Sequence, residues 1–145
     1  MDEELYQEQI LEHYKHPLHK EIMSTFSFTY HDLNPLCGDD ITIYGKINKD
    51  KKITLSFMGH GCAISQASAS LLIDSLQHKT IQDIEKLTPE SIYTLLGIKI
   101  SPGRVNCALL SLNTLKKGLE VYKIKQEKEK EETAKKENTS FKTKK

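Results

Sequence analysis

Two neighbouring segments in which apolar and polar residues alternate constrain the fold of this 145-residue chain most strongly. The segments 40–48 and 51–58 each gather apolar side chains on one face, a period of two that is typical of half-buried strands. These side chains are Ile41, Ile43 and Ile47 in the first segment and Ile53, Leu55 and Phe57 in the second. The short connection Asn48-Lys49-Asp50 predicts an antiparallel hairpin. Together with a strand predicted over 24–32, it forms a three-stranded sheet whose apolar face must be covered.

Helical segments supply the cover. Residues 63–78 have apolar side chains at helical spacing and contain no Gly or Pro, which predicts a helix directly after the sheet. A shorter helix has Thr88 as its N-cap, Pro89 as its first residue and Gly97 as its stop. That helix covers 90–96, and helical spacing is found in three further ranges: 2–16, 81–87 and 104–122. We therefore predict an α+β domain, a three-stranded antiparallel sheet with an N-terminal helix and several helices packed on one face.

Charge is distributed unevenly along the chain. Residues 123–145 hold nine Lys and five Glu, so the net charge of +1 for the chain leaves about −3 on residues 1–122. We expect 1–122 to form one domain and 123–145 to be a Lys/Glu-rich helical extension or a disordered tail. The domain has no basic stripe, which argues against nucleic-acid binding. An acidic N-terminus and the lack of a long apolar run predict a cytoplasmic chain with no membrane partner.

Three cysteines occupy the predicted ends of elements, where side chains project from a rigid scaffold into a shared space. Cys37 lies in Asn34-Pro35-Leu36-Cys37-Gly38-Asp39, Cys62 follows Gly59-His60-Gly61, and Cys107 follows Arg104-Val105-Asn106. In a reducing compartment an odd number of cysteines indicates free, metal-bound or reactive thiols rather than disulfides. Because a fourth cysteine is missing, Asp39 is the candidate fourth ligand. Helix N-termini beside Cys62 and Cys107 would favour thiolates.

Other interpretations of these residues remain open. The cysteines could be small buried hydrophobes, and His60 with Cys62 could form a Cys/His nucleophile, although no orienting Asn or Asp is evident. The histidines at 13, 16 and 19 are predicted to lie on a solvated face and receive no role. A closed structural zinc site is a weaker interpretation, because aspartate is a less usual ligand there.

Four motifs resemble the scaffold proteins of iron-sulfur cluster assembly, of the IscU/SufU/NifU N-terminal type. They are His13-Tyr14-Lys15-His16-Pro17, Asn34-Pro35-Leu36-Cys37-Gly38-Asp39, Gly61-Cys62-Ala63-Ile64-Ser65-Gln66-Ala67-Ser68-Ala69-Ser70 and Arg104-Val105-Asn106-Cys107-Ala108-Leu109-Leu110. The resemblance covers roughly residues 5–122 and implies a SufE/NifU-like fold. It also implies that Cys37, Asp39, Cys62 and Cys107 hold a transient iron-sulfur cluster or Zn²⁺. The implied partners are a cysteine desulfurase, which delivers persulfide sulfur, and apo iron-sulfur proteins as recipients.

The chain departs from both branches of this family. IscU-like members have a His before the third cysteine and a Leu-Pro-Pro-Val-Lys segment, where this chain has Asn106 and residues 100–104. The departure argues against a dedicated chaperone. Arg104 is SufU-like, but the 45-residue separation of Cys62 and Cys107 leaves no room for the SufU insertion.

We expect a scaffold rather than an enzyme, with a zinc-dependent sulfurtransferase that stimulates a desulfurase as the alternative. Cys37 is the candidate sulfur acceptor by its resemblance to SufU. Cys107 is the rival acceptor by its resemblance to IscU.

Overall fold

As predicted, the three strands form one antiparallel sheet, and they lie in it in their order along the chain. The computed structural model describes residues 3–143, with side chains through residue 134. The strands are β1 (Phe28–Asn34), β2 (Asp39–Ile47) and β3 (Ile53–His60). Ile43 of the central strand pairs with Tyr30 of β1 and with Phe57 of β3. The alternation in β2 and β3 therefore places their isoleucine, leucine and phenylalanine side chains on one buried face.

Strand β1 begins and ends later than the predicted range 24–32. At its start, Ser27 is joined to β2 by a backbone bond to Gly45 and by its hydroxyl, which accepts from the Ile47 amide at 2.9 Å. At its other end the strand continues until Asn34 pairs with Asp39 of β2. The prediction was wrong here because the end of this strand is set by cross-strand pairing, which its own residues do not encode. As a result, β1 and β2 carry the tight loop that contains Cys37.

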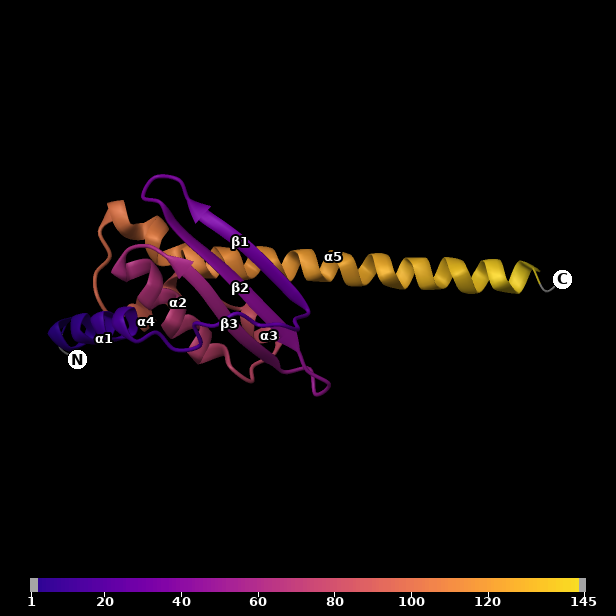
Figure 1. Ribbon diagram of the computed structural model, residues 1–145, viewed down its shortest axis with the longest axis horizontal. Coiled ribbons are helices and arrows are strands. Elements are labelled where there is room, and N and C mark those ends of the chain that lie inside the picture. Colours follow the sequence, from indigo (N-terminus) through magenta and orange to yellow (C-terminus); the bar gives the residue numbers. More distant parts are fainter. Residues whose placement is uncertain (1–2, 144–145) are drawn as a thin grey trace.

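Two long helices cover the buried face of the sheet, behind the strands in Figure 1. They are α2 (Ala63–Leu76) and α5 (Val105–Thr143), and α1 (Glu3–Lys15) packs on α2. Between α2 and α5 the chain forms α3 (Ile81–Glu85), α4 (Pro89–Leu96) and a 3₁₀ turn at Pro102–Arg104. Pro89 opens α4, and Gly97 ends it with φ +68°, as predicted. These elements form the predicted α+β architecture.

The core lies between the sheet and these helices. Side chains from both layers are fully buried there, and the largest are Ile41, Ile43, Ile53, Leu55, Phe57, Leu72, Ile73, Ile84, Ile92, Leu96, Leu112 and Leu115. Burying a side chain of this size contributes about 1.5–3 kcal/mol, so this cluster is the main source of stability. It also holds the N-terminal ends of α2 and α5 against the sheet, and these ends carry Cys62 and Cys107.

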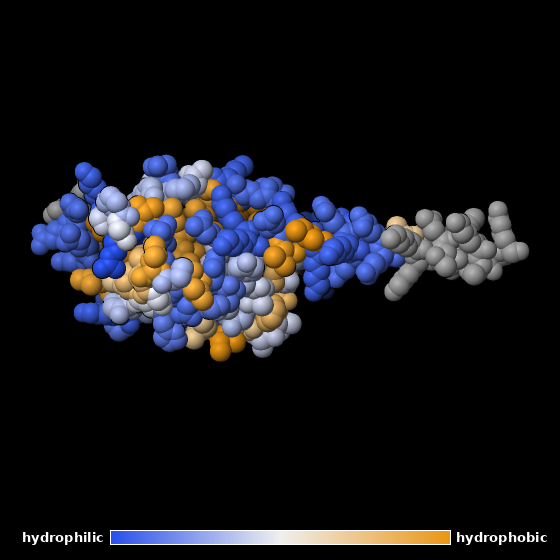
Figure 2. Space-filling model, turned by 90° about the horizontal axis from the view of Figure 1, so that it is seen from above, coloured by the Kyte–Doolittle hydropathy of each residue, from blue (hydrophilic) through white to orange (hydrophobic). Residues whose placement is uncertain are grey.

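Helix α5 extends well past the domain body (Figure 1). The sequence predicted a helix over 104–122 followed by a helical extension or a disordered tail, and in the structure the helix continues through Thr143. Beyond the body, its described surface is largely hydrophilic (Figure 2), and the side chains of residues 127–134 are exposed. Among the described residues, no helix is long and apolar enough to cross a membrane.

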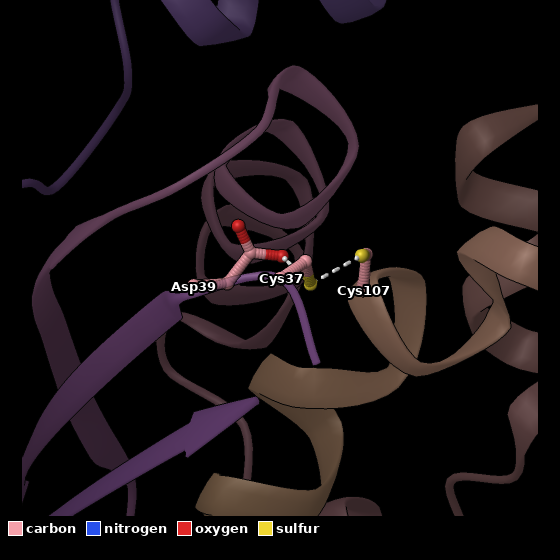
Figure 3. Close-up of side chains that lie close together, drawn as sticks. All are labelled: Cys37, Asp39 and Cys107. Atoms are coloured by element: carbon pink, nitrogen blue, oxygen red, sulfur yellow. Dashed lines mark hydrogen bonds between the residues drawn. The ribbon is translucent and has the colours of Figure 1, made fainter. Parts of the chain in front are cut away.

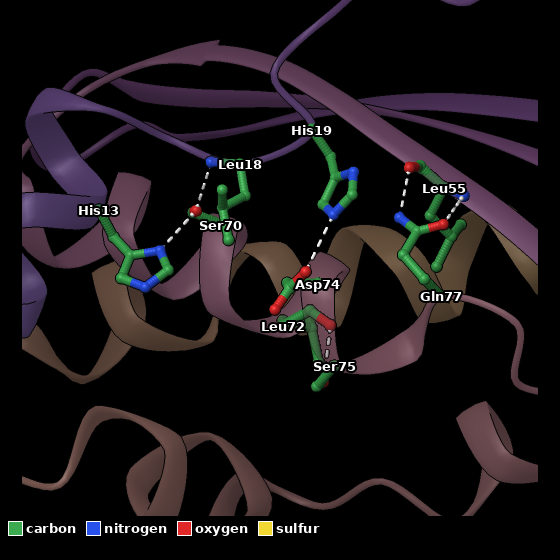
Figure 4. A network of polar contacts seen from close by, with 9 residues as sticks. All are labelled: His13, Leu18, His19, Leu55, Ser70, Leu72, Asp74, Ser75 and Gln77. Atoms are coloured by element: carbon green, nitrogen blue, oxygen red, sulfur yellow. Dashed lines mark hydrogen bonds and ion pairs between the residues drawn. The ribbon is translucent and has the colours of Figure 1, made fainter.

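The N-terminal histidines do not all lie on a solvated face, so that prediction was partly wrong. His13 Nδ1 lies 2.7 Å from Ser70 Oγ, and His19 Nε2 lies 3.0 Å from Asp74 Oδ1 (Figure 4). Both partners are on α2, more than 50 residues along the chain. His16 is exposed, as predicted. His13 and His19 therefore help to attach the N-terminal segment to α2.

Candidate metal centre

A tight loop between β1 and β2 presents the first predicted ligand. Asn34 and Asp39 are paired across the strands, so residues 35–38 form the loop. The Asn34 carbonyl accepts from the amides of Cys37 at 3.3 Å and Gly38 at 2.9 Å, and Gly38 has φ +71°. Glycine adopts this left-handed conformation without the steric cost of a Cβ. The loop leaves Cys37 exposed, whereas Asp39, in the strand, is only 1% exposed.

Three of the four predicted ligands converge. Cys37 Sγ lies 3.1 Å from Asp39 Oδ2 and 3.2 Å from Cys107 Sγ (Figure 3). One ligand atom from each of these residues lies within 4.8 Å of the other two. The three side chains come from the loop, from β2 and from the first turn of α5. The fold thus brings together residues that are up to 70 positions apart in the sequence.

The fourth predicted ligand, Cys62, lies beside this group. It is the N-cap of α2, where its sulfur accepts from the Ser65 amide at 3.5 Å. Its own amide donates to Asp39 Oδ1 at 2.9 Å, and its Sγ lies 3.7 Å from Asp39 Oδ2. Gly61 allows this approach, since a Cβ there would overlap the Asp39 carboxylate. Asp39 therefore connects Cys62 to the other two cysteines.

The pKa values in this group follow from burial and hydrogen bonding. Burial raises the pKa of Asp39, but hydrogen bonds from Cys37, Cys107 and Cys62 outweigh it and hold the pKa below its ordinary value. Burial also raises the pKa of the Cys107 thiol, and its contacts with Asp39 and Cys37 raise it further. Burial and these contacts therefore oppose the thiolate form of Cys107 that its helix N-terminus was expected to favour. Asp39 is the anionic group around which the thiols gather.

Two further side chains lie beside the site, and neither of them was predicted as a ligand from the sequence. Asn34 Nδ2 donates to Cys37 Sγ at 2.9 Å. Arg104 is exposed, and its pKa is raised by the charge of Cys62, by a hydrogen bond to that sulfur and by Cys107. Both residues stand inside motifs that contain a cysteine, which is the signal by which they could have been found.

The alternative interpretations of the cysteines find little support in the structure. His60 has an 88% exposed side chain that faces Asp40, with Nδ1 3.6 Å from Asp40 Oδ1. It is therefore directed toward a carboxylate and does not pair with Cys62 as a general base. Cys37 is exposed, so it is not a small hydrophobe of the core. Of the three thiols, only Cys107 is fully buried, and it contacts a carboxylate and a second sulfur.

Comparisons with known proteins identify the family. A model of the NifU-like N terminal domain matches residues 5–129. The chain is 32% identical to the zinc-dependent sulfurtransferase SufU of Bacillus subtilis, with 79% of this chain and 89% of the relative covered. It is 33% identical to the iron-sulfur cluster assembly scaffold protein IscU of Thermotoga maritima, with 59% and 72% covered.

A solved structure indicates the same family. The chain is similar to a candidate iron-sulfur cluster assembly scaffold protein for the SUF system from Fervidobacterium islandicum AW-1. The TM-score is 0.67 and the identity 28%, with 82% of this chain and 99% of that one covered. The sequence resemblance to this family is thereby confirmed. The chain belongs to the NifU-like N-terminal domain family.

Proposed function

We propose that this protein assembles iron-sulfur clusters. It accepts sulfur from a cysteine desulfurase, holds a transient cluster on Cys37, Asp39, Cys62 and Cys107, and delivers the cluster to apo iron-sulfur proteins. The observation that carries this proposal is the convergence of two thiols and a carboxylate within 4.8 Å, with a third thiol beside them. Relatives named as IscU scaffolds and as SufU support the same class of function.

The donor set fits both metals named for these relatives. Thiolates are the usual ligands of iron-sulfur clusters and of zinc. Two thiolates bound at about 2.3 Å to one tetrahedral zinc ion lie about 3.8 Å apart, and the Cys37 and Cys107 sulfurs, at 3.2 Å, need to separate only slightly. The single carboxylate is a harder ligand than thiolate and should exchange more readily. A scaffold needs such a ligand because it must release what it builds.

Cys37 is the better placed sulfur acceptor. It lies on an exposed loop, whereas Cys107 is 1% exposed. In the proposed step the Cys37 thiolate attacks the outer sulfur of the desulfurase persulfide. The sulfur–sulfur bond of the persulfide breaks, the desulfurase cysteine leaves as a thiolate, and Cys37 becomes the persulfide. Cys107 serves as a ligand in this proposal.

A zinc-dependent sulfurtransferase is the second candidate. Similarity to the Bacillus subtilis SufU over 79% of this chain favours it. Arg104, a SufU-like feature, has its pKa raised by Cys62 and Cys107, which places its positive charge beside the site. Bound zinc would hold the thiols of the site as thiolates. In this alternative the protein is an enzyme, and the persulfide on Cys37 passes to an acceptor without cluster assembly.

An anaerobic assay separates the two candidates. The protein, with and without zinc, is given iron, cysteine and a partner desulfurase, and cluster absorption and desulfurase turnover are followed together. Cluster absorption that builds up on the zinc-free chain supports the scaffold. Turnover that rises only with zinc, with no cluster, would refute the scaffold and favour the sulfurtransferase. A Cys37→Ser variant tests the acceptor, because it should lose the persulfide that mass spectrometry detects on the wild type.

We further propose that residues 1–122 carry this function and that 123–145 are an accessory extension. The NifU-like match ends at residue 129, near this boundary. Asn106 and residues 100–104 differ from the residues that IscU-like members have there, which argues against a dedicated chaperone.

We also propose a cytoplasmic location. The three free thiols suit the cytoplasm, where reducing conditions preserve them.

A further inference from the structure

Asn34 is a buried side chain directed at two sulfur atoms. It is 7% exposed, although the loop residues 35–38 that follow it are exposed. Its Nδ2 donates to Cys37 Sγ at 2.9 Å and lies 3.8 Å from Cys107 Sγ. Its Oδ1 accepts from the Leu36 amide at 3.2 Å. One carboxamide therefore contacts the loop with its oxygen and both sulfurs with its nitrogen.

We infer that Asn34 is a positioning residue whose side-chain NH₂ holds the Cys37 sulfur against the Cys107 sulfur. Its use in binding cargo rests on the proposed function, whereas the positioning itself can be measured without any metal. Cys107 is fixed by burial in α5. Cys37 lies in an exposed loop beside Gly38, which has open space around it. The sulfur of Cys37 is therefore the mobile member of the pair, and the hydrogen bond from Asn34 restrains it.

The two ends of the carboxamide have separable effects. The oxygen stabilises the turn through Leu36, and the nitrogen donates toward the sulfurs. An N–H donor also lowers the energy of negative charge on sulfur, which favours two thiolates held close together. Replacing Asn34 with Asp keeps the oxygen and removes the donor, whereas replacing it with Ala removes both. A comparison of the two variants separates the effect of the N–H donor on the sulfurs from the effect of the oxygen on the turn.

The matched control is Asn106→Asp. Asn106 is exposed, lies next to Cys107 in the sequence and lines the same surface hollow as Asn34. The same substitution there adds the same charge near the site and leaves the Asn34 donor in place.

The first test measures the closeness of the two sulfurs in the reduced, metal-free full-length chain. Dibromobimane labels one thiol and then links it to a second thiol that lies close by. Peptide mass spectrometry gives the ratio of Cys37–Cys107 cross-link to singly labelled Cys37, which is insensitive to the rate of the first reaction. Loss of one hydrogen bond should lower this ratio about 3- to 10-fold in Asn34→Asp and Asn34→Ala. Asn106→Asp should match the wild type.

Each other pattern overturns the inference. If Asn34→Ala lowers the ratio and Asn34→Asp does not, the side chain acts only through the turn. If only Asn34→Asp lowers it, charge repulsion is the cause, and an unchanged ratio in both variants excludes positioning. Thermal unfolding of each variant verifies that it is folded. If Asn34→Ala does not fold, Asn34→Asp is compared with Asn106→Asp. A ratio lowered only in Asn34→Asp then supports the donor role, and equal ratios exclude it.

The second test uses Co²⁺ as a spectroscopic probe of the thiolates. Loss of the N–H donor raises the energy of the sulfur electrons, so the thiolate-to-cobalt band should move to longer wavelength in Asn34→Ala. A bound ion with an unmoved band would contradict the donor role. If the wild type binds no Co²⁺ while the cross-link ratio still falls, the proposed function is wrong and the positioning inference stands. If Co²⁺ binds and the ratio does not change, the inference is wrong and the metal site stands.

Discussion

Removal of the Asp39 side chain should reveal how much stability this carboxylate supplies. The carboxylate is buried, and its Oδ1 accepts from the Cys62 amide at 2.9 Å. A hydrogen bond to a charged group contributes about 1.5–3 kcal/mol. Asp39→Ala should lower the free energy of unfolding by this amount, or the midpoint by about 6–12 °C for a domain of this size. Asp39→Asn keeps a neutral acceptor and should lose about 1 kcal/mol.

The assay is thermal unfolding of the reduced, metal-free protein over a series of pH values, followed by circular dichroism. Because the pKa of Asp39 is depressed in the fold, its stabilisation is present above the ordinary value of 3.8 and is lost as the pH falls through the lower folded value. The difference in stability between the wild type and Asp39→Asn should therefore become smaller below about pH 4. Asp74→Asn, an exposed control whose carboxylate pairs with His19, should lose at most about 1 kcal/mol. A difference in stability that stays constant from pH 7 to pH 3 would show that the Asp39 charge does not stabilise the fold.

Other perturbations test the site and the fold. Gly61→Ala places a Cβ against the Asp39 carboxylate and should weaken Zn²⁺ binding about tenfold or more in a chelator competition; unchanged affinity would exclude Asp39 as a ligand. Gly97→Ala puts a Cβ at φ +68° against the Tyr6 ring, and should lower the free energy of unfolding by about 1–3 kcal/mol in a denaturant titration. Deletion of residues 131–145 should change the stability by less than about 0.5 kcal/mol, since the described side chains there are exposed; a larger loss would show that the extension packs on the domain. Asp39→Ala should also hold an assembled cluster for longer, as followed by its absorption, and loss of all metal binding would exclude Asp39 as the release ligand.

The sheet and its covering helices could be predicted because their signal is local. Ile41 and Ile43 alternate with polar residues within one strand, and the helix after Cys62 is an uninterrupted apolar stretch. The ends of β1 could not be placed in this way. They depend on Ser27 and Asn34 contacting residues of β2, and a strand's own composition does not specify its register with a neighbour.

The cysteines of the candidate site were predicted from their motifs, but their surroundings were not. Burial raises the pKa of Cys107, and this burial results from packing of the whole domain rather than from the first turn of its helix. Asn34 precedes Pro35 in a motif that indicates only a turn. Its carboxamide reaches two sulfurs only because α5 packs beside the loop, and the sequence motif does not show this packing. Long-range contacts thus determine the chemistry of residues that local patterns merely locate.

The four candidate ligands differ in how firmly the fold holds them, and this difference has a functional consequence. Asp39 lies in a paired strand, Cys62 caps α2, and Cys107 is buried in α5, so moving any of them disturbs the core. Cys37 lies in an exposed loop that is held to Asn34 by two backbone bonds and two side-chain bonds. Local openings that break few contacts need little free energy compared with global unfolding. In the proposed function, Cys37 would therefore leave a bound metal to accept sulfur while the backbones of the other three ligands stay in place. The Asp39 carboxylate would set how tightly the cargo is held, and neither step requires unfolding of the domain.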